Sequence, residues 1–383
     1  MKQAKIKVMA VFGTRPEAIK MAPLVKEMSQ NAQIEPIVCV SAQHRQMLDQ
    51  VLSIFNITPD HDLNIMRPGQ TLTDITTNAM LGIEGCIVKR KPDIVLVHGD
   101  TTTTLAGSLA AFHNKVMVGH VEAGLRTFDK YSPYPEEINR RITSQIADLH
   151  FAPTKTNKEN LLRENITKGI FITGNTVIDA LKTTVHKNYK FKAAQLKEID
   201  LTKPTILLTA HRRENLGEPL ENIMRGILEI VQKNEGVQVV YPVHLNPAVR
   251  ETVFSVLGGV PNVFLIDPVD VEDLHNLMNR VTFVMTDSGG LQEEAPALGK
   301  PVLVLREETE RPEAVEHGTV KIAGTSREKI VHLAEALLHD EDLYRAMSAA
   351  INPYGDGAAS RRIVQAILFS FGKKSKAPDD FCV

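Results

Sequence analysis

Short runs of consecutive apolar residues alternate along this chain with longer stretches in which apolar residues recur every three or four positions. The short runs are apolar throughout, which is typical of parallel strands covered on both faces, and the longer stretches have the period of helices. Strands are expected at residues 6–12, 34–41, 93–99, 116–122, 149–153 and 170–174, and again at 205–211, 237–244, 262–267, 281–287, 301–306 and 319–324. The clearest helices are expected at residues 16–28, 104–113, 221–231 and 327–338.

This alternation predicts an α/β fold in two domains. The strand series restarts after a polar, lysine-rich stretch at residues 182–203, and 383 residues are long for a single core. We therefore expect two Rossmann-like, doubly wound parallel-sheet domains with an interdomain cleft, at residues 1–175 and 176–364. The final helix is expected at residues 360–371, and the C-terminal segment of about residues 365–383 is expected to pack back onto the first domain.

Composition and charge exclude several classes of protein. Lys and Arg number 44 against 46 Asp and Glu, a net charge of −2, so neither nucleic acid nor a membrane surface is an expected partner. The chain has no apolar run of about 18 residues, and its first apolar run reads as a strand instead of a signal peptide. Its three cysteines, Cys39, Cys86 and Cys382, form no CxxC pair, so we expect a reducing, cytoplasmic compartment and no zinc site.

The turn after the expected strand at 281–287 is suited to a nucleotide diphosphate. Ser288, Gly289 and Gly290 join that strand to a helix, and the free N–H groups at a helix start bind phosphate well. Glu294, one turn into the helix, can accept hydrogen bonds from ribose hydroxyls. The alternative is an ordinary strand-to-helix turn with glycines for close packing.

Three carboxylates form a second candidate group, because ligands bind beyond the carboxyl ends of parallel strands. Asp100 and Glu122 follow two expected strands, and Glu136 follows a proline-rich loop. Such a set can remove and deliver protons on opposite faces of a sugar. The alternative for each residue is a structural role, and Asp100 in particular resembles a helix N-cap.

Cations at other strand ends are candidates for phosphate binding. Arg15 and Lys20 lie five residues apart at the start of the first helix, and His211 ends a strand of the second series. His211 is placed to bind or protonate a leaving diphosphate; alternatively it bonds a neighbouring loop, and Lys20 is merely solvated. No GxGxxG follows the first strand, no GxxxxGK[ST] occurs and the histidines lack ligand spacing, so NAD, an ATPase site and a metal are not expected.

Eight motifs resemble the non-hydrolysing UDP-N-acetylglucosamine 2-epimerase family of bacteria. The resemblance implies a glycosyltransferase-B-like fold, a homodimer, and interconversion of UDP-N-acetylglucosamine and UDP-N-acetylmannosamine without NAD or metal. It also implies elimination of UDP to 2-acetamidoglucal followed by re-addition, in the supply of precursors for cell-wall or surface polysaccharide. The motifs occur in order at residues 12–20, 97–104, 119–127, 173–181, 209–215, 241–247, 286–301 and 309–319.

The resemblance also implies roles for single residues. Those for the chemistry are Asp100, Glu122, Glu136 and His211, and those for the substrate are Arg15, Lys20, Leu274, Ser288, Gly289, Gly290, Glu294 and Arg311. Leu274 stands where relatives often place an aromatic residue against the uracil. Activation by UDP-N-acetylglucosamine at a neighbouring site would use Gln43, His44, Gln46, Gln70, Arg212 and His244, although Gly69 stands where a relative can carry Arg.

Other functions for the same residues remain open at this stage. A UDP-sugar glycosyltransferase would share the diphosphate site and need an acceptor. A hydrolysing epimerase would release the free sugar, and a non-catalytic UDP-sugar sensor would not need the three carboxylates together. The sequence does not decide which carboxylate is the acid and which is the base.

Overall fold

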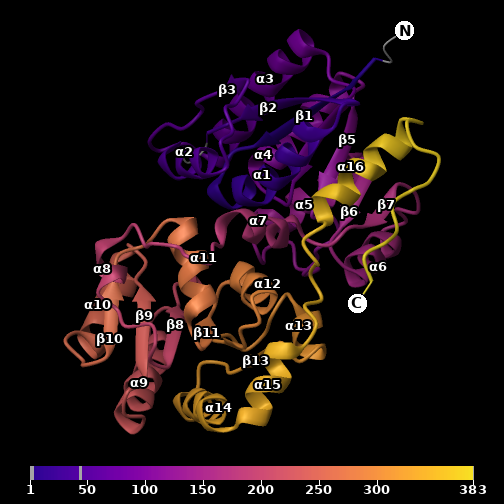
Figure 1. The fold of residues 1–383 in the computed structure, drawn as a ribbon. Helices are drawn as coiled ribbons and strands as arrows, with labels where there is room; N and C mark the ends of the chain where they lie inside the picture. Colours follow the sequence, from indigo (N-terminus) through magenta and orange to yellow (C-terminus); the bar gives the residue numbers. More distant parts are fainter. Residues whose placement is uncertain (1–3, 43–44, 383) are drawn as a thin grey trace. The chain divides into compact units, whose positions relative to one another are not determined.

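The computed structural model describes residues 4–42 and 45–382, with the side chains of residues 45–47 left out. The chain divides into two compact units (Figure 1). The first comprises the residues up to Thr183 together with Tyr354–Cys382, and the second comprises Thr184–Pro353. The sequence places the boundary after residue 175, whereas the structure divides at the end of the next helix, because Ala180 of that helix belongs to the core of the first unit.

The first unit is built on a sheet that has seven strands among the described residues, in the order β3-β2-β1-β4-β5-β6-β7, and every neighbouring pair is parallel. Its strands are β1 (Ile6–Phe12), β2 (Ile34–Val40), β3 (His61–Asp62), β4 (Ile94–His98), β5 (Met117–Val121), β6 (Leu149–Ala152) and β7 (Ile170–Ile172). Its helices are α1 (Arg15–Gln30), α2 (Arg45–Ile54), α3 (Leu72–Arg90), α4 (Thr102–His113), α5 (Glu136–Ile146), α6 (Lys155–Arg163), α7 (Thr176–Thr184) and α16 (Ala359–Ser370).

The last helix of the chain, α16, packs in the first unit beside α1 (Figure 1). Its apolar side chains, among them Ile363 and Ile367, join the core cluster that contains Met21 and Leu24 of α1. The helix has nearly the expected bounds, residues 360–371: it ends at Ser370, and Gly372 follows with φ +66°. It does not extend over the whole C-terminal range of about 365–383. The chain beyond it is not helical, and the N–H of Phe381 donates to Ile172 O at 2.8 Å.

The second unit repeats this plan with a six-stranded parallel sheet, counted over the described residues, in the order β10-β9-β8-β11-β12-β13. Its strands are β8 (Thr205–Thr209), β9 (Gln238–Pro242), β10 (Val263–Ile266), β11 (Phe283–Thr286), β12 (Val302–Val304) and β13 (Val320–Ile322). Its helices are α8 (Ala194–Lys197), the 3-10 helix η1 (Arg213–Asn215), α9 (Glu218–Lys233), α10 (Pro247–Leu257), α11 (Val271–Arg280), α12 (Gly289–Ala297), α13 (Pro312–Glu316), α14 (Arg327–His339) and α15 (Glu341–Ala349).

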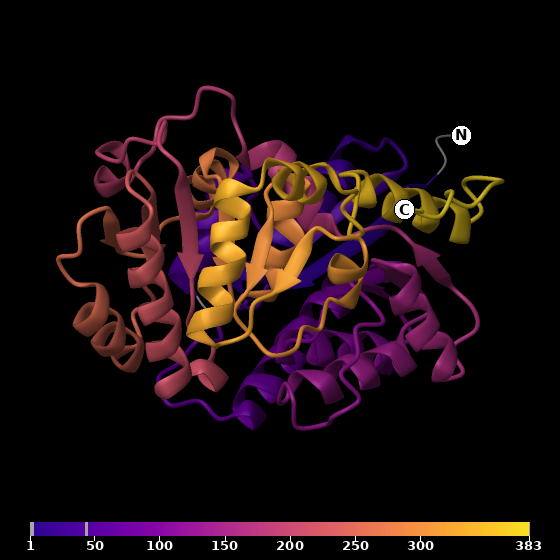
Figure 2. The same ribbon diagram turned by 90° about the horizontal axis from the view of Figure 1, so that it is seen from below.

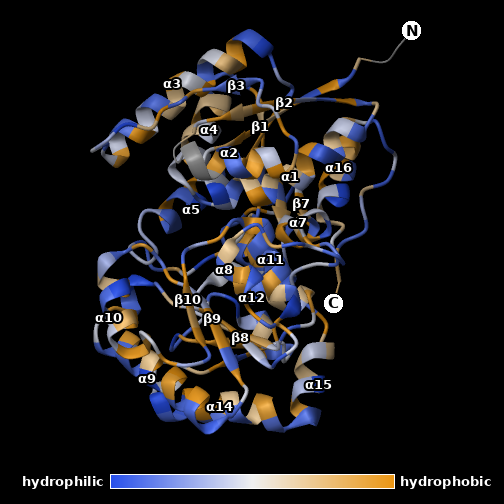
Figure 3. Cartoon of the chain, turned by 60° about the vertical axis from the view of Figure 1, so that its left-hand side comes forward, coloured by the Kyte–Doolittle hydropathy of each residue, from blue (hydrophilic) through white to orange (hydrophobic). Residues whose placement is uncertain are grey.

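Helices α9 and α14 lie side by side on the second sheet (Figure 2). Their buried residues, such as Ile227 and Ile330, share one apolar cluster with Ile206 and Leu208 of β8. The strands β8 and β9 are strongly hydrophobic (Figure 3), as a sheet covered by helices requires. The expected α/β fold with parallel sheets is therefore confirmed.

The pattern missed β3, which has two residues, His61 and Asp62, neither of them apolar. Within the described part of the chain, no helix is both long and apolar enough to cross a membrane.

Candidate functional site

In the first unit, a single buried carboxylate joins the turns that follow β1 and β4. Thr14 caps α1, and Glu17, which is 2% exposed, accepts hydrogen bonds from the N–H groups of Gly13 (3.0 Å) and Thr14 (2.8 Å). Its other oxygen accepts from the hydroxyls of Thr101 (2.7 Å) and Thr104 (3.3 Å). Glu17 thus holds two strand ends in a fixed arrangement, and the Thr-x-x-Glu spacing is the signal in the sequence that marks it.

Gly13 cannot carry a side chain here. A Cβ atom would lie 1.9 Å from Ser41 Oγ and 2.9 Å from Thr103 Oγ1, and these two hydroxyls are themselves hydrogen-bonded at 2.9 Å. The ends of β1 and β2 and the start of α4 therefore pack against one another, as a site at the carboxyl edge of a sheet requires.

Glu122, which follows β5, is buried and surrounded by hydrogen-bond donors. It has φ +62°, forms an ion pair with Lys20, accepts from Asn175 Nδ2 at 2.9 Å and lies 3.5 Å from His98 Nε2. Burial alone would raise its pKa, but the charge of Lys20 and the neighbouring His98 outweigh burial and hold the pKa of Glu122 well below its ordinary value. Glu122 is therefore an ionised carboxylate, and Lys20 is bound to it.

Asp100, which follows β4, is also paired with a cation, but its pKa is shifted in the opposite direction. Its carboxylate lies 2.7 Å from Arg140 Nη2 and keeps a quarter of its side-chain surface exposed. Burial raises its pKa above the ordinary value; Arg140 opposes that shift, while Glu122 and Glu136 reinforce it. The reading of Asp100 as a helix N-cap is wrong, because Thr101 caps α4 by accepting from Thr104 N at 3.1 Å.

Glu136 is the first residue of α5 and completes the set. Its Oε2 atom is buried and has no hydrogen-bond partner among the described residues. Because its charge raises the pKa of Asp100, as does that of Glu122, the three carboxylates share one electrostatic neighbourhood. The structure thus brings together Asp100, Glu122 and Glu136.

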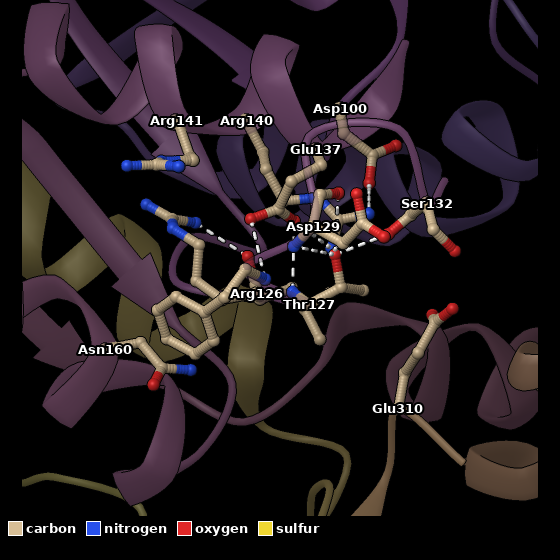
Figure 4. A network of polar contacts seen from close by, with 12 residues as sticks. Asp100, Arg126, Thr127, Asp129, Ser132, Glu137, Arg140, Arg141, Asn160 and Glu310 are labelled. Atoms are coloured by element: carbon tan, nitrogen blue, oxygen red, sulfur yellow. Dashed lines mark hydrogen bonds and ion pairs between the residues drawn. The ribbon is translucent and has the colours of Figure 1, made fainter. Parts of the chain in front are cut away.

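The neighbouring loop is held by Glu137, which is fully buried. Its carboxylate accepts from the N–H groups of Thr127 (3.0 Å) and Phe128 (3.2 Å) and lies 3.6 Å from Arg140 (Figure 4). Arg140 therefore lies between the carboxylates of Glu137 and Asp100. Arg140 is not among the residues expected from the sequence, although it follows Glu136 by four residues and so lies on the same face of α5.

His120 of β5 fixes the turn that carries Asp100. Its Nε2 lies 2.7 Å from Gly99 O, and Gly99 has φ +65°. Burial lowers the pKa of His120 to about 3, so the ring is neutral at pH 7 and its Nε2 donates to the carbonyl. This structural histidine was also missed, since nothing in the sequence distinguishes it from any other residue of a buried strand.

In the second unit, Asp287 organises the residues that follow β8. This carboxylate is fully buried and accepts from the N–H groups of His211 (2.7 Å) and Arg212 (2.8 Å) and from Asn215 Nδ2 (3.1 Å). Its other oxygen lies 3.7 Å from His211 Nδ1. The His211 ring stacks on His244 at 5.1 Å. Burial lowers the pKa of His211, while Asp287 opposes that shift.

The turn at Ser288, Gly289 and Gly290 begins α12 as expected. Ser288 is its N-cap and makes no side-chain cap hydrogen bond. A Cβ on Gly289 would lie 2.8 Å from the Arg311 guanidinium, which is in turn held by Glu293 Oε1 (2.8 Å from Nε). Arg311 also lies 3.1 Å from Glu310. Arg311 therefore lies against the glycine turn, where its position is set by two acids.

Glu294 of α12 is hydrogen-bonded to a histidine of α11, His275. Its Oε2 lies 3.1 Å from Nε2 of His275, whose Nδ1 lies 2.7 Å from Thr184 Oγ1. Leu274 is the residue before His275 and is half-buried. His275 is not among the residues expected from the sequence, because Thr184 and Glu294 become its partners only in the folded chain.

The remaining predicted residues are placed as follows. Arg15 is half-buried in the first turn of α1. Gln70 Oε1 accepts from Arg67 N at 2.8 Å, Arg212 is half-buried and His244 is exposed. Gln43 and His44 lie outside the described residues, as does the side chain of Gln46. Over the described residues, no three His, Cys, Asp or Glu side chains are grouped to hold a metal ion.

Comparisons with known proteins show the family of the chain. The family model described as UDP-N-acetylglucosamine 2-epimerase matches residues 26–368. The UDP-N-acetylglucosamine 2-epimerase of Bacillus subtilis (strain 168) is 60% identical over 378 residues, covering 98% of this chain and 99% of that protein. The UDP-GlcNAc 2-epimerase of Neisseria meningitidis, in a crystal structure bound to UDP-GlcNAc, is 50% identical with a TM-score of 0.87, covering 95% of this chain and 100% of that chain.

A more distant likeness concerns the fold alone. The glycosyltransferase SnogD from Streptomyces nogalater has a TM-score of 0.60 at 15% identity, covering 95% of this chain and 100% of that one. The fold is therefore glycosyltransferase-B-like, as the motifs implied. Because the family model spans most of the chain and the relatives match nearly end to end, the chain belongs to the UDP-N-acetylglucosamine 2-epimerase family and is an isomerase.

Proposed function

We propose that this chain interconverts UDP-N-acetylglucosamine and UDP-N-acetylmannosamine by inverting C2 of the sugar, with the nucleotide retained. The observation that carries the proposal is the carboxylate cluster of the first unit, Asp100, Glu122 and Glu136. A protein that only bound UDP-sugars would have no use for three neighbouring acids, of which Asp100 has a raised pKa and Glu122 a lowered one. The likeness to proteins named UDP-N-acetylglucosamine 2-epimerases supports the same substrate.

The chemistry requires elimination. C2 of the sugar is not next to a carbonyl, so its proton is hardly acidic. Departure of UDP from C1 builds oxocarbenium character that acidifies C2, and loss of the C2 proton then gives 2-acetamidoglucal. Protonation of C2 on the other face, with return of the UDP oxygen to C1, gives the epimer. Atoms balance without an oxidant, a reductant or water.

The opposed pKa shifts suggest how the carboxylates divide this work. Asp100, whose pKa is raised, retains a proton to higher pH and suits the acid. We assign the base to Glu136, because it has a buried oxygen without a hydrogen-bond partner among the described residues. Glu122 stays ionised and orients Lys20.

The second unit supplies the groups for the nucleotide. The N–H groups at the start of α12, in the turn Ser288-Gly289-Gly290, face a diphosphate in this proposal, and Arg311 and His211 add positive charge as UDP leaves. Glu294 accepts from the ribose, and Leu274 gives the uracil an apolar contact. In the first unit, Arg15 binds the substrate beside Lys20.

The proposal also includes the compartment, the oligomeric state, the cofactors, the pathway and the activation that the family resemblance implies. The enzyme works in the cytoplasm as a homodimer, without NAD or a metal ion, and supplies precursors of cell-envelope polysaccharide. Activation by UDP-N-acetylglucosamine uses Gln70, Arg212 and His244 together with Gln43, His44 and Gln46. The stacking of His244 on His211 links that group to a residue of the reaction.

The test is proton NMR of the purified protein with UDP-N-acetylglucosamine alone in D2O. The intact manno epimer should appear with deuterium at C2, while C1, C3 and C4 stay unlabelled. Free N-acetylmannosamine would indicate a hydrolase instead, and an unchanged spectrum would indicate a transferase or a sensor. Product with hydrogen fully retained at C2 would contradict the elimination route.

A further inference from the structure

His275 of α11 is a fully buried histidine that no step of the proposed reaction uses. Its side chain is 1% exposed. Each ring nitrogen has one polar neighbour: Nδ1 lies 2.7 Å from Thr184 Oγ1, and Nε2 lies 3.1 Å from Glu294 Oε2. A buried histidine with a partner at each nitrogen connects those partners through a rigid ring.

The carboxylate partner fixes the direction of one of these hydrogen bonds. A carboxylate oxygen accepts, so Nε2 of His275 donates to Glu294 Oε2. The Thr184 hydroxyl can donate to Nδ1 or accept from it. Thr184 thus holds the ring in place with Nε2 directed to Glu294.

Thr184 is itself held on α11. Asn276 Nδ2 donates to Thr184 O at 2.7 Å, and the N–H of His186 donates to Asn276 Oδ1 at 2.9 Å. The segment from Thr184 to His186 is therefore attached to the residue next to His275. This attachment keeps the Thr184 hydroxyl in reach of the ring.

The other oxygen of Glu294 points to the glycine turn. Glu294 Oε1 lies 3.1 Å from the position that a Cβ on Gly290 would occupy. With Oε2 on His275, the carboxylate has one oxygen fixed in the protein and the other directed to the start of α12. A freely rotating glutamate would lose rotamer entropy on binding a ligand, and this one is already ordered.

We propose that His275 is a positioning residue that orients Glu294 for the hydroxyls of a ribose, through the relay Thr184–His275–Glu294. The inference rests on the proposed nucleotide site and adds the groups that give it selectivity for a ribose. It concerns binding, and His275 does not touch the reacting atoms.

Calorimetry on the full chain tests the relay with two ligands, UDP and 2′,3′-dideoxy-UDP, which lacks both ribose hydroxyls. His275→Asn keeps a polar group near Thr184 and removes the donor to Glu294. We expect it to weaken UDP binding about tenfold, the loss expected for one charge-assisted hydrogen bond. Binding of dideoxy-UDP should stay unchanged, so the preference for UDP over dideoxy-UDP falls.

Two further variants separate positioning from a general structural role. His275→Gln places its amide nitrogen near the position of Nε2 and should recover most of the preference for UDP. His339→Asn changes another histidine of the second unit, one that bonds Asn234, and should leave both affinities unchanged. Equal losses for both ligands in His275→Asn would overturn the proposal, because a distorted fold would not distinguish the hydroxyls.

Glu294→Ala and the double variant, with both His275→Asn and Glu294→Ala, complete a double-mutant cycle. If His275 acts through Glu294, His275→Asn should cost nothing further once Glu294 is alanine. An additional loss in the double variant, or an unchanged preference in His275→Asn while Glu294→Ala lowers it, would overturn the inference alone. Unchanged UDP affinity in Glu294→Ala would instead remove Glu294 from the proposed nucleotide site.

Discussion

The carboxylate cluster of the first unit and the Asp287 turn of the second unit both contain buried acids, yet the acids have different surroundings. Asp287 accepts from the backbone of His211 and Arg212, so it fixes a loop. Asp100 and Glu122 face the cations Arg140 and Lys20, and their pKa values are shifted in opposite directions.

This difference separates two uses of a buried charge. A carboxylate that accepts from the backbone N–H groups of a loop, as Asp287 does, fixes the geometry of that loop. A carboxylate beside another carboxylate and a cation has an ionisation state that its neighbours set. We therefore assign the proton transfers to the first unit and the holding of the nucleotide to the second.

Replacing single acids of the cluster tests whether the first unit carries out the proton transfers. Asp100→Asn and Glu136→Gln should each lower kcat roughly 10²–10⁴-fold, the contribution of a positioned proton-transfer group. Glu122→Gln should also lower kcat, because Lys20 loses the carboxylate that orients it. UDP affinity, measured by calorimetry, should remain near that of the parent protein. A variant with full activity would lose its catalytic assignment, and His211 would be the next candidate.

Asp287→Ala should act mainly on stability. It leaves the N–H groups of His211 and Arg212 without their acceptor, at roughly 1–3 kcal/mol for each donor left unsatisfied. Asn215 Nδ2 loses one of two acceptors and keeps Leu305 O. Urea unfolding followed by circular dichroism should show a lower midpoint. Asp379→Ala, at an exposed acid, is the control and should shift the midpoint little. An unchanged midpoint in Asp287→Ala would contradict the scaffold role.

The pH dependence of stability should differ between the two shifted acids. Glu122 has a folded-state pKa below its ordinary value of 4.5, so it stabilises the fold above pH 4.5 and loses that contribution as pH falls through the depressed pKa. Glu122→Gln should therefore lower stability at pH 7 and approach the parent protein in acid.

The contribution of Asp100 to the stability of the fold has the reverse dependence on pH. Its folded-state pKa lies above the ordinary 3.8, so its contribution is present below pH 3.8 and is lost as pH rises through the raised pKa. Asp100→Asn should consequently retain the stability of the parent protein at pH 7. Urea midpoints for both variants across this range measure the contrast, and parallel curves would contradict the opposed shifts.

Treatment with a metal chelator should change the activity least of all these experiments. Elimination and re-addition of UDP balance without a Lewis acid in the proposal, so EDTA treatment should leave kcat unchanged in the NMR assay. Activity abolished by EDTA and restored by a divalent ion would contradict the proposal, and Asp100, Glu122 and Glu136 would then have to be considered as metal ligands.

The sequence by itself determined the elements and the edge of the sheet at which the chemistry lies. Buried parallel strands are read from uninterrupted apolar runs such as those at β1 and β8, since every residue of such a strand is covered. Asp100 and Glu122 follow two strands that are consecutive in the chain, and consecutive strands of such a sheet are usually neighbours, as β4 and β5 are. The turn at Ser288-Gly289-Gly290 was also local, because glycines and a helix start are neighbours in the chain.

Only the tertiary structure decided which partner each polar group has. Lys20 and Glu122 are 102 residues apart, and Thr184 and His275 are 91 apart. An acid's ionisation depends on its burial and on the charges around it, and both are set by packing between distant segments. Asp100 and Glu122 are therefore similar as residues in a sequence, and only the fold gives them pKa values shifted in opposite directions.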